Sequence, residues 1–432
     1  MGAKDALCDL VEKELHTNPK RAQQIITAVY KAFGLYQKHF PVKGRAPSRQ
    51  YLANICMDVM LSAYTHPERS AFVSIFTPCE ILQAFDLSPV CAEMFSTFLN
   101  GAGCEKPFVD AAESAGIAET YCSYHKILIG AAVTRFLPNP AYIINTSLAC
   151  DANNLTFRAL AQAYEKEQFY IDVPYSKDEY AVAYVAEQLH SLADFISEKT
   201  GRKLDLDKLA AITRRSAETI RIMQETISWR RTRWLSGDLT SELYESLMMH
   251  SCLGTPEAYQ YACRLLDDYR KAPLDTGKRI VWMHSNPFWQ KPVMDALNYR
   301  PDFHIAATEM SYDVWQRFDP SDPFRFMAQR LVYDPFNGPV QDRMSFTRDM
   351  AKKINASGVV LFCHWGCKET CGASGLIKKG IEESGIPCLV LNGDGVDRHN
   401  ASDGQTSTRI GAFLEMLENQ DSRTESAASD KA

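Results

Sequence analysis

The 432-residue sequence contains no uninterrupted apolar run near the roughly 18 residues of a membrane-spanning helix. Its 47 Lys and Arg residues do not outnumber its 53 Asp and Glu residues, and the formal net charge is -6 at pH 7. We therefore expect no membrane and no nucleic acid as partner, since clustered positive charge is needed to bind a phosphate backbone. The N-terminus also lacks a secretory signal, and Ala6 stands where a myristoylation signal has Ser or Thr. These absences predict a cytoplasmic protein.

The cysteines lack close pairs such as C-x2-C, so a structural zinc site is not indicated. A reducing cytoplasm also argues against disulfides, and most of the thirteen cysteines are interpreted as small buried hydrophobes. Five lie inside helical or strand patterns and are assigned to packing: Cys8, Cys56, Cys252, Cys263 and Cys388. Cys79, Cys91 and Cys104 stay ambiguous between packing and chemistry. Cys79 opens a helix, a setting that in general lowers the pKa of a thiol.

The chain does contain a repeated alternation of short apolar runs and helical patterns, which is typical of parallel α/β units. The expected fold class is α/β, with two doubly wound parallel-sheet domains of the Rossmann or flavodoxin type. We place the first domain at 69–190 and the second at 276–415. Helical patterns occupy an N-terminal segment, 1–68, and an insert, 191–275, which is interpreted as a spacer or clamp. The polar stretch 416–432 is expected to be a disordered tail.

Cys122, Cys150 and Cys367 differ from the other cysteines, because each lies in a loop or turn at the mouth of an α/β unit. Ligands of open parallel sheets bind beyond the carboxyl ends of the strands, so three thiolates on this rim can meet in a cleft between two domains. Thiolates select zinc or iron–sulfur clusters over hard cations. Widely separated cysteines suit a cluster held between domains, and three ligands leave one iron open to water or substrate.

A second reading of Cys367 groups it with Cys363 and Cys371 in the run "CHWGCKETC". This C-x3-C-x3-C spacing is close to the C-x3-C-x2-C of radical enzymes that use adenosylmethionine. The second interval is one residue too long, however, and no Gly-rich adenosylmethionine loop stands out. We therefore interpret Cys363 as the last residue of a buried strand and Cys371 as the start of a helix, and retain only Cys367 as a ligand candidate.

Segments that resemble a known family follow one another along the chain: "CSYHKILIGAA" (122–132), "ACDANNLTFRAL" (149–160), "FYIDVPY" (169–175), "HWGCKET" (364–370) and "GIPCLVLNGDGVD" (385–397). They are similar to the 2-hydroxyacyl-CoA dehydratases, a family that includes relatives of benzoyl-CoA reductase. The resemblance extends from about residue 70 to about residue 415. "WGCK" and "GQTSTRIGAFLEML" look more like the alpha, substrate-binding subunit than the beta subunit.

The resemblance implies a heterodimer with a homologous beta subunit, each subunit holding one [4Fe-4S] cluster on three cysteines, here Cys122, Cys150 and Cys367. It also implies a separate ATP-dependent iron–sulfur activator protein that injects one electron. The family eliminates water from an (R)-2-hydroxyacyl-CoA to give the (E)-2-enoyl-CoA. The electron reduces the thioester carbonyl to a ketyl radical anion, hydroxide leaves C2, the acidified C3 proton departs, and the electron returns.

Two polar residues near the first strand are expected by this resemblance to act on the substrate: Ser74 as a hydrogen-bond donor and Glu93 as an acid or base. Their ordinary alternatives are a satisfied strand hydroxyl and a helix-capping carboxylate. The chain has no histidine near Thr77, where we expected a proton-transfer partner. His125 and His364 are the candidates to replace it.

Other functions fit the same cysteines. One is a benzoyl-CoA-reductase-like, ATP-coupled reductase subunit, and another is a non-catalytic iron–sulfur electron-transfer protein. Asn153 is expected to support the neighbouring Cys150 ligand. The "GDGVD" turn lacks a complete G-x-G-x-x-G and no Walker lysine motif is present, so we do not expect ATP to bind this chain. The acyl group, and the choice between a distinct beta subunit and a homodimer, stay open.

Overall fold

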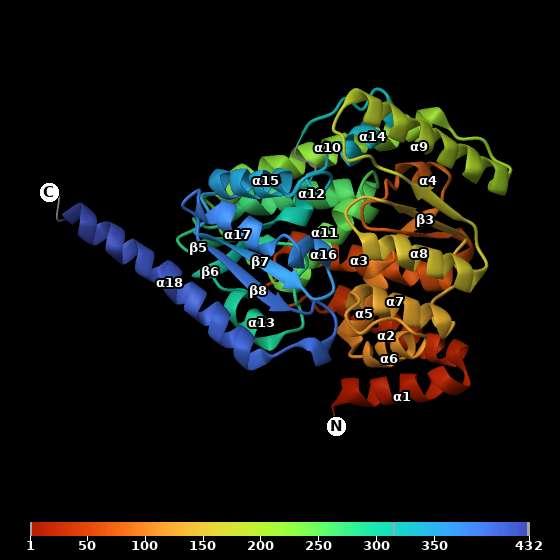
Figure 1. Cartoon of the computed structure of the whole chain (residues 1–432), viewed down its shortest axis with the longest axis horizontal. Coiled ribbons are helices and arrows are strands. Elements are labelled where there is room, and N and C mark those ends of the chain that lie inside the picture. The colour runs from red at the N-terminus through yellow and green to blue at the C-terminus, as the bar shows by residue number, and fades with distance from the viewer. Residues whose placement is uncertain (1, 314–315, 430–432) are drawn as a thin grey trace.

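Two four-stranded sheets, each with helices packed around it, form the body of the protein (Figure 1). The computed structural model describes residues 2–313 and 316–429. Both sheets are entirely parallel, which confirms the predicted α/β class with two Rossmann- or flavodoxin-like units. Within the described ranges, no helix has both the length and the apolar content needed to cross a membrane.

Three helices precede the first sheet: α1 (Ala3–Thr17), α2 (Pro19–His39) and α3 (Pro47–Thr65). Proline stands at the first position of α2 and α3, where no intrahelical N–H bond is lost. The side chain of Asn18 accepts a hydrogen bond from the backbone N–H of Arg21 and so caps α2. These three helices lie within the range 1–68, which the sequence predicts to be a helical segment.

The first sheet has the strand order β2-β1-β3-β4. Its strands are β1 (Ser70–Val73), β2 (Ser88–Cys91), β3 (Tyr142–Thr146) and β4 (Gln168–Ile171). The helices of this half are α4 (Glu80–Ala84), α5 (Glu93–Ala102), α6 (Lys106–Ser114), α7 (Ser123–Val133) and α8 (Asp151–Tyr164). The strand β2 contains Pro89, which an edge strand tolerates because a proline cannot donate to the ladder.

The second sheet repeats this arrangement in the order β6-β5-β7-β8. Its strands are β5 (Lys278–Met283), β6 (Phe303–Thr308), β7 (Gly358–His364) and β8 (Cys388–Gly393). Its helices are α13 (Lys291–Leu297), α14 (Pro323–Val332), α15 (Val340–Lys353), α16 (Lys368–Cys371), α17 (Ser374–Glu382) and α18 (Asp403–Ser429). In both sheets the chain reverses its direction of winding between the two central strands, β1/β3 and β5/β7, which is where ligands bind in such folds.

The helical insert consists of α9 (Glu179–Thr200), α10 (Leu206–Arg230), α11 (Leu239–Ser251) and α12 (Pro256–Lys271). Each of these helices begins at a side chain that accepts a hydrogen bond from the first turn: Asp178, Asp205, Asp238 and Thr255. Such capping is strongly favoured at helix N-termini and marks the four starts in the sequence. The insert packs on both α/β halves, since α11 contacts α3 and β2 as well as β6.

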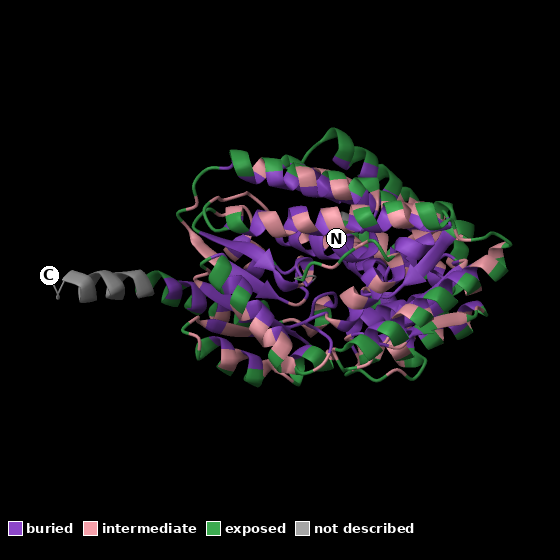
Figure 2. Cartoon of the chain, turned by 90° about the horizontal axis from the view of Figure 1, so that it is seen from above, coloured by how far each residue is buried: buried purple, intermediate pink, exposed green. Residues whose placement is uncertain are grey.

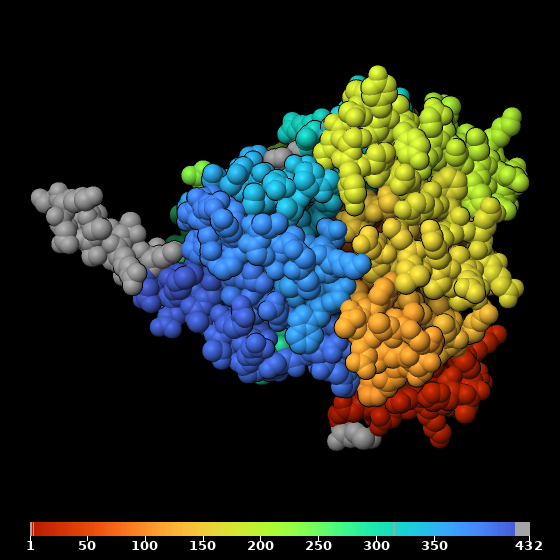
Figure 3. All heavy atoms as spheres, in the orientation of Figure 1, coloured from red at the N-terminus to blue at the C-terminus, as the bar shows by residue number. Residues whose placement is uncertain are grey.

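The hydrophobic core is continuous across the two sheets (Figure 2). In β5, Val281 and Met283 belong to this large core, while the alternate residues Ile280 and Trp282 belong to a smaller core on the other face of the sheet. That alternation is the two-residue period of a strand buried on both faces. The two α/β halves therefore share one packed interior and also meet along their surface (Figure 3).

The last helix, α18, closes the smaller core with Ile410, Phe413 and Leu417. The helix continues to Ser429 and so includes most of the range 416–432 that was expected to be a tail. Residues 430–432 of that range lie outside the described residues.

Candidate functional site

A cavity of about 120 Å³ lies where the carboxyl ends of the two sheets face each other. This volume is several times the roughly 10–15 Å³ that admits one water. Residues that end or follow the four central strands line it: Ile75 and Phe76 after β1, Ala149, Cys150 and Asn153 after β3, His284, Ser285 and Asn286 after β5, and His364, Cys367 and Glu369 at the end of β7. The cavity thus lies at the winding reversals of both sheets at once.

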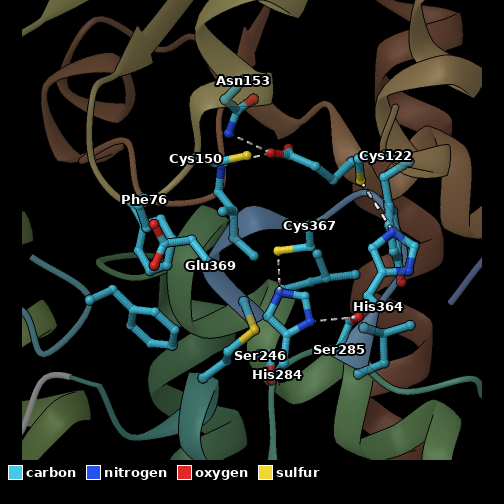
Figure 4. Close-up of a pocket in the computed structure, with 18 of the residues that line it drawn as sticks. Phe76, Cys122, Cys150, Asn153, Ser246, His284, Ser285, His364, Cys367 and Glu369 are labelled. Carbon is cyan, nitrogen blue, oxygen red and sulfur yellow. Dashed lines mark hydrogen bonds between the residues drawn. The ribbon is translucent and has the colours of Figure 1, made fainter. Parts of the chain in front are cut away.

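The three predicted cysteines meet in this cavity (Figure 4). Each occupies the position directly before a helix: Cys122 before α7, Cys150 before α8 and Cys367 before α16. Free N–H groups and the positive end of a helix both favour a negatively charged sulfur.

A different histidine contacts each of these sulfurs. The Sγ–Nε2 distances are 3.2 Å for Cys122 and His364, 3.5 Å for Cys150 and His125, and 3.5 Å for Cys367 and His284. Burial lowers the pKa of His125 to about 3 and lowers the pKa of His364 and of His284 as well, so the three rings are neutral. The imidazoles that contact the three sulfurs are therefore neutral.

Burial is the main cause that raises the pKa of the Cys122, Cys150 and Cys367 thiols. The charges of the neighbouring cysteines add to the effect at Cys122 and Cys150, because close thiolates repel one another. Such thiols ionise readily only when a bound metal compensates their charge. A raised pKa argues against an activated nucleophile at these three positions.

Three thiols are a donor set that suits a soft metal ion or an iron–sulfur cluster. Among the described residues, no three His, Cys, Asp or Glu side chains are close enough to hold one metal ion. A single ion needs all its sulfur ligands at about 2.3 Å, whereas a cluster spreads its cysteines over several irons. Four buried polar atoms at the cavity find no hydrogen-bond partner in the described part of the chain: Tyr124 Oη, His125 Nδ1, Asn153 Oδ1 and Asn286 Oδ1. They are free to bind a polar ligand.

Glu93 lines the cavity, as its predicted role requires. Its carboxylate accepts hydrogen bonds from Asn153 Nδ2 at 3.0 Å, from the Cys91 thiol at 3.0 Å and from the backbone N–H of Ile75 at 3.4 Å. Burial raises the pKa of Glu93, and these donors partly offset the effect. Asn153 therefore connects two parts of the site, since its backbone faces Cys150 while its side chain holds Glu93.

Ser74 lies behind the wall of the cavity and is not among its lining residues. Its hydroxyl is 2.8 Å from Thr77 Oγ1 and accepts a hydrogen bond from the backbone N–H of Thr146 at 3.2 Å. In this position it joins the carboxyl ends of β1 and β3. A catalytic role for Ser74 stays a prediction, while Phe76 is the residue of this turn that faces the cavity.

His284 also lines the cavity, but it is not among the residues predicted from the sequence. The rule that selected the cysteines applies to His284 as well, because this residue directly follows the buried strand β5. The helical insert, predicted to be a spacer or clamp, also contributes to the site through helix α11. Leu243, Ser246 and Leu247 of this helix line the cavity. Helix α11 reaches the site through tertiary packing alone, so no local signal in the sequence indicates it.

A buried ion pair between Arg343 and Glu309 lies near Cys367. The guanidinium of Arg343 bonds to the carboxylate of Glu309, which also accepts from the backbone N–H of His284 at 2.7 Å. The positive charge of Arg343 lowers the pKa of Cys367, against the larger effect of burial. The ion pair thus holds the backbone of His284 and places a positive charge near the sulfur of Cys367.

The remaining cysteine interpretations need two corrections. Cys371 is the last residue of α16 and not the start of a helix, and Cys363 is followed in β7 by His364. The thiols of Cys363 and Cys371 lie 3.3 Å apart. Cys79 does precede a helix, but burial raises the pKa of its thiol well above the usual value. Desolvation in the core therefore outweighs the helix terminus at Cys79.

Known proteins are similar to this chain over most of its length. A sequence model described as "2-hydroxyglutaryl-CoA dehydratase, D-component" matches residues 74–417. The chain is 21% identical over 380 residues to the (R)-phenyllactyl-CoA dehydratase alpha subunit of Clostridium sporogenes, covering 83% of this chain and 91% of that protein. It is 20% identical over 307 residues to the (R)-2-hydroxyglutaryl-CoA dehydratase alpha subunit of Acidaminococcus fermentans, covering 66% and 62%. Because the match spans most of its length, the chain belongs to the 2-hydroxyglutaryl-CoA dehydratase D-component family.

Proposed function

We propose that this chain is the alpha-type, iron–sulfur subunit of an (R)-2-hydroxyacyl-CoA dehydratase, with a [4Fe-4S] cluster held by Cys122, Cys150 and Cys367. The observation that carries the proposal is the meeting in one cavity of these three cysteines, each directly before a helix and contributed by both α/β halves. The names of the two alpha-subunit relatives support a 2-hydroxyacyl-CoA as the substrate class. The proposal includes a cytoplasmic heterodimer with a homologous beta subunit and an ATP-dependent iron–sulfur activator protein.

When bound, the cluster supplies the one-electron reduction of the thioester carbonyl that gives the ketyl radical anion and makes hydroxide departure and C3 deprotonation accessible. The chain itself has to bind the acyl group, exclude water and place a proton. Because the cofactor carries the redox step, these tasks define what the remaining lining residues do.

One part of the cavity suits an acyl group. Apolar side chains from four different segments line it: Phe76, Leu243, Leu247, Met310 and Phe336. An apolar wall excludes water from a reactive radical and strengthens the electrostatic interactions within the site. A cluster used only for electron transfer needs no such space, so the cavity favours an enzyme over a carrier protein.

Glu93 is the proton donor of the proposal. Hydroxide leaves C2 more readily when an acid protonates it, and an efficient acid has a pKa near the working pH. Burial shifts the pKa of Glu93 upward, in this direction. Asn153 holds the carboxyl group toward the cavity through its 3.0 Å hydrogen bond. The later removal of the C3 proton requires a base. Once Glu93 has given its proton to the leaving hydroxide, its carboxylate can accept the C3 proton.

The test is anaerobic reconstitution of the wild-type chain and of Cys150→Ala, with Cys263→Ala as the matched control. Cys263 lies on helix α12 and is not a lining residue of the cavity. Iron, sulfide and electron paramagnetic resonance (EPR) are measured first. Activity is then assayed with the beta subunit, the activator protein, ATP and a panel of (R)-2-hydroxyacyl-CoA thioesters.

We expect a four-iron signal in the wild type and in Cys263→Ala, a cluster-deficient Cys150→Ala protein that remains folded, and elimination of water from at least one thioester. A correctly folded wild-type chain that binds no iron and sulfide would overturn the proposal. So would a cluster whose EPR signal is the same with and without acyl-CoA in the assembled heterodimer, since that result indicates an electron carrier.

A further inference from the structure

The hydrogen bond between His364 and Cys122 has a defined donor and a defined acceptor. The backbone N–H of Gly395 donates to His364 Nδ1 at 3.1 Å, so this nitrogen is an acceptor and carries no proton. The proton must therefore be on Nε2, which lies 3.2 Å from Cys122 Sγ. The imidazole donates an N–H···S hydrogen bond to the cysteine.

The imidazole has little freedom to leave this position. The side chain of His364 is 1% exposed. Its ring packs edge-on against Tyr124, with the centroids 5.3 Å apart, and lies nearly parallel to Phe362 at 6.5 Å. The carbonyl of Gly395, whose N–H sets the tautomer, is itself held by the indole N–H of Trp289 at 2.8 Å. The donor is thus oriented before any ligand binds.

The other two histidines of the site are not oriented in this way. His125 Nδ1 has no partner among the described residues, and its Nε2 is 3.5 Å from Cys150 Sγ. His284 Nδ1 faces the hydroxyl of Ser285 at 3.1 Å, and a hydroxyl can either donate or accept. Only for His364 does a backbone N–H determine which ring nitrogen is the donor.

We propose that His364 is a positioning residue that raises the reduction potential of the cluster by donating its Nε2–H to the sulfur of Cys122. The inference rests on the proposed function, because it needs the cluster. Hydrogen bonds to ligand sulfurs are one of the factors that set iron–sulfur potentials. A donor withdraws electron density from the sulfur and stabilises the reduced cluster more than the oxidised one. The acceptance of an electron from the activator becomes easier.

The hydrogen bond also crosses the boundary between the two α/β halves, since His364 ends β7 and Cys122 precedes α7. A second bond crosses beside it, from Ser123 Oγ to Asp394 at 2.5 Å. If the halves separate, the cluster loses its donor, and its potential falls. The potential therefore depends on the closed arrangement, which couples electron acceptance to a correctly assembled site.

The experiment compares wild type, His364→Leu and His364→Gln, each reconstituted anaerobically. Leucine removes the donor, whereas the glutamine amide can present an N–H close to the position of Nε2. His399→Leu serves as the control, because His399 is 60% exposed and is not a lining residue. Iron and sulfide content establish the cluster, and a redox titration followed by EPR gives its midpoint potential.

We expect unchanged iron content, a more negative potential in His364→Leu, and a potential nearer to wild type in His364→Gln and His399→Leu. Equal potentials in all four proteins would overturn this inference alone. A wild-type protein without iron and sulfide would instead overturn the proposed function and the inference with it. If His364→Leu does not fold, pulsed EPR of wild type labelled with 15N-histidine tests the bond instead. A nitrogen coupling to the reduced cluster that disappears in His364→Gln supports the hydrogen bond. The absence of such a coupling contradicts it.

Discussion

Gly366 lies against the backbone of Cys122 so closely that a Cβ atom on the glycine would be 2.5 Å from the Cys122 nitrogen. Gly366 also has a φ of 78°, in the left-handed region that favours glycine. The turn after β7 thus meets the segment before α7 backbone to backbone. Two of the three proposed ligands, Cys367 and Cys122, are placed by this single contact between the α/β halves.

Gly366→Ala is therefore expected to combine two penalties. Left-handed backbone costs a non-glycine residue roughly 1–2 kcal/mol, and overpacking a filled site costs about 1–3 kcal/mol more. Gly385→Ala is the matched control, because Gly385 has a similar φ of 81° but no atom within 4 Å of its added Cβ. We expect denaturant unfolding to show the larger loss for Gly366→Ala, together with a lower iron content. Equal losses in the two variants would show that the contact tolerates a side chain.

Arg343 and Glu309 form a buried ion pair, with side chains 3% and 0% exposed. Removing one partner of such a pair leaves an uncompensated charge and costs about 3–5 kcal/mol. We predict a loss of this size in the free energy of unfolding of Arg343→Met. The exposed pair Arg348 and Asp349, with side chains 33% and 53% exposed, provides the comparison. Arg348→Met should cost less than about 1 kcal/mol.

The pH dependence of stability tests the environment of Glu93. Burial raises its pKa above the usual 4.5. Its contribution to stability is thus fully present below pH 4.5 and is lost as the pH rises through the raised pKa, because the folded protein then has to bury a carboxylate.

Glu93→Gln keeps a neutral side chain at all pH values. Its free energy of unfolding relative to wild type should therefore increase as the pH rises through this window. Urea unfolding at a series of pH values measures the change. A difference between the two proteins that stays constant from about pH 4 to about pH 8 would show that the carboxyl group is not shifted.

The site could be predicted from the sequence where it depends on strand ends. Cys150 and Cys367 follow the strands β3 and β7, and parallel sheets bring such positions to one edge, whereas Cys122 lies between the helices α6 and α7. Phe76 and Ser74 show where this reasoning stops. They are two residues apart in the turn after β1, and only the path of the backbone decides which of them faces the cavity.

Contributions from distant segments could not be predicted in this way. Ser246 reaches the cavity because α11 packs across both halves, and the sequence of α11 is equally suited to a purely structural helix. The alternation of α/β units did predict two parallel sheets, since consecutive strands with helical crossovers have few allowed arrangements.

The close pair of thiols Cys363 and Cys371 gives a further prediction. Their sulfurs are 3.3 Å apart, Cys363 is buried and Cys371 is exposed. We expect oxidised glutathione to react first at Cys371, forming a mixed disulfide and releasing one glutathione. Cys363 then attacks this disulfide and releases the second glutathione, so that two thiols become one disulfide and the glutathione takes up the two electrons.

Burial raises the pKa of Cys363 to about 12, so this second step should be slow at neutral pH. Peptide mapping under non-reducing conditions detects the Cys363–Cys371 linkage, and Cys371→Ser should lack it while Cys263→Ser retains it. The disulfide would close a ring around Cys367 and restrict the turn that carries this ligand. We therefore expect the oxidised protein to take up less iron on reconstitution than the reduced protein, and equal uptake would show that the turn keeps its shape when its two ends are joined.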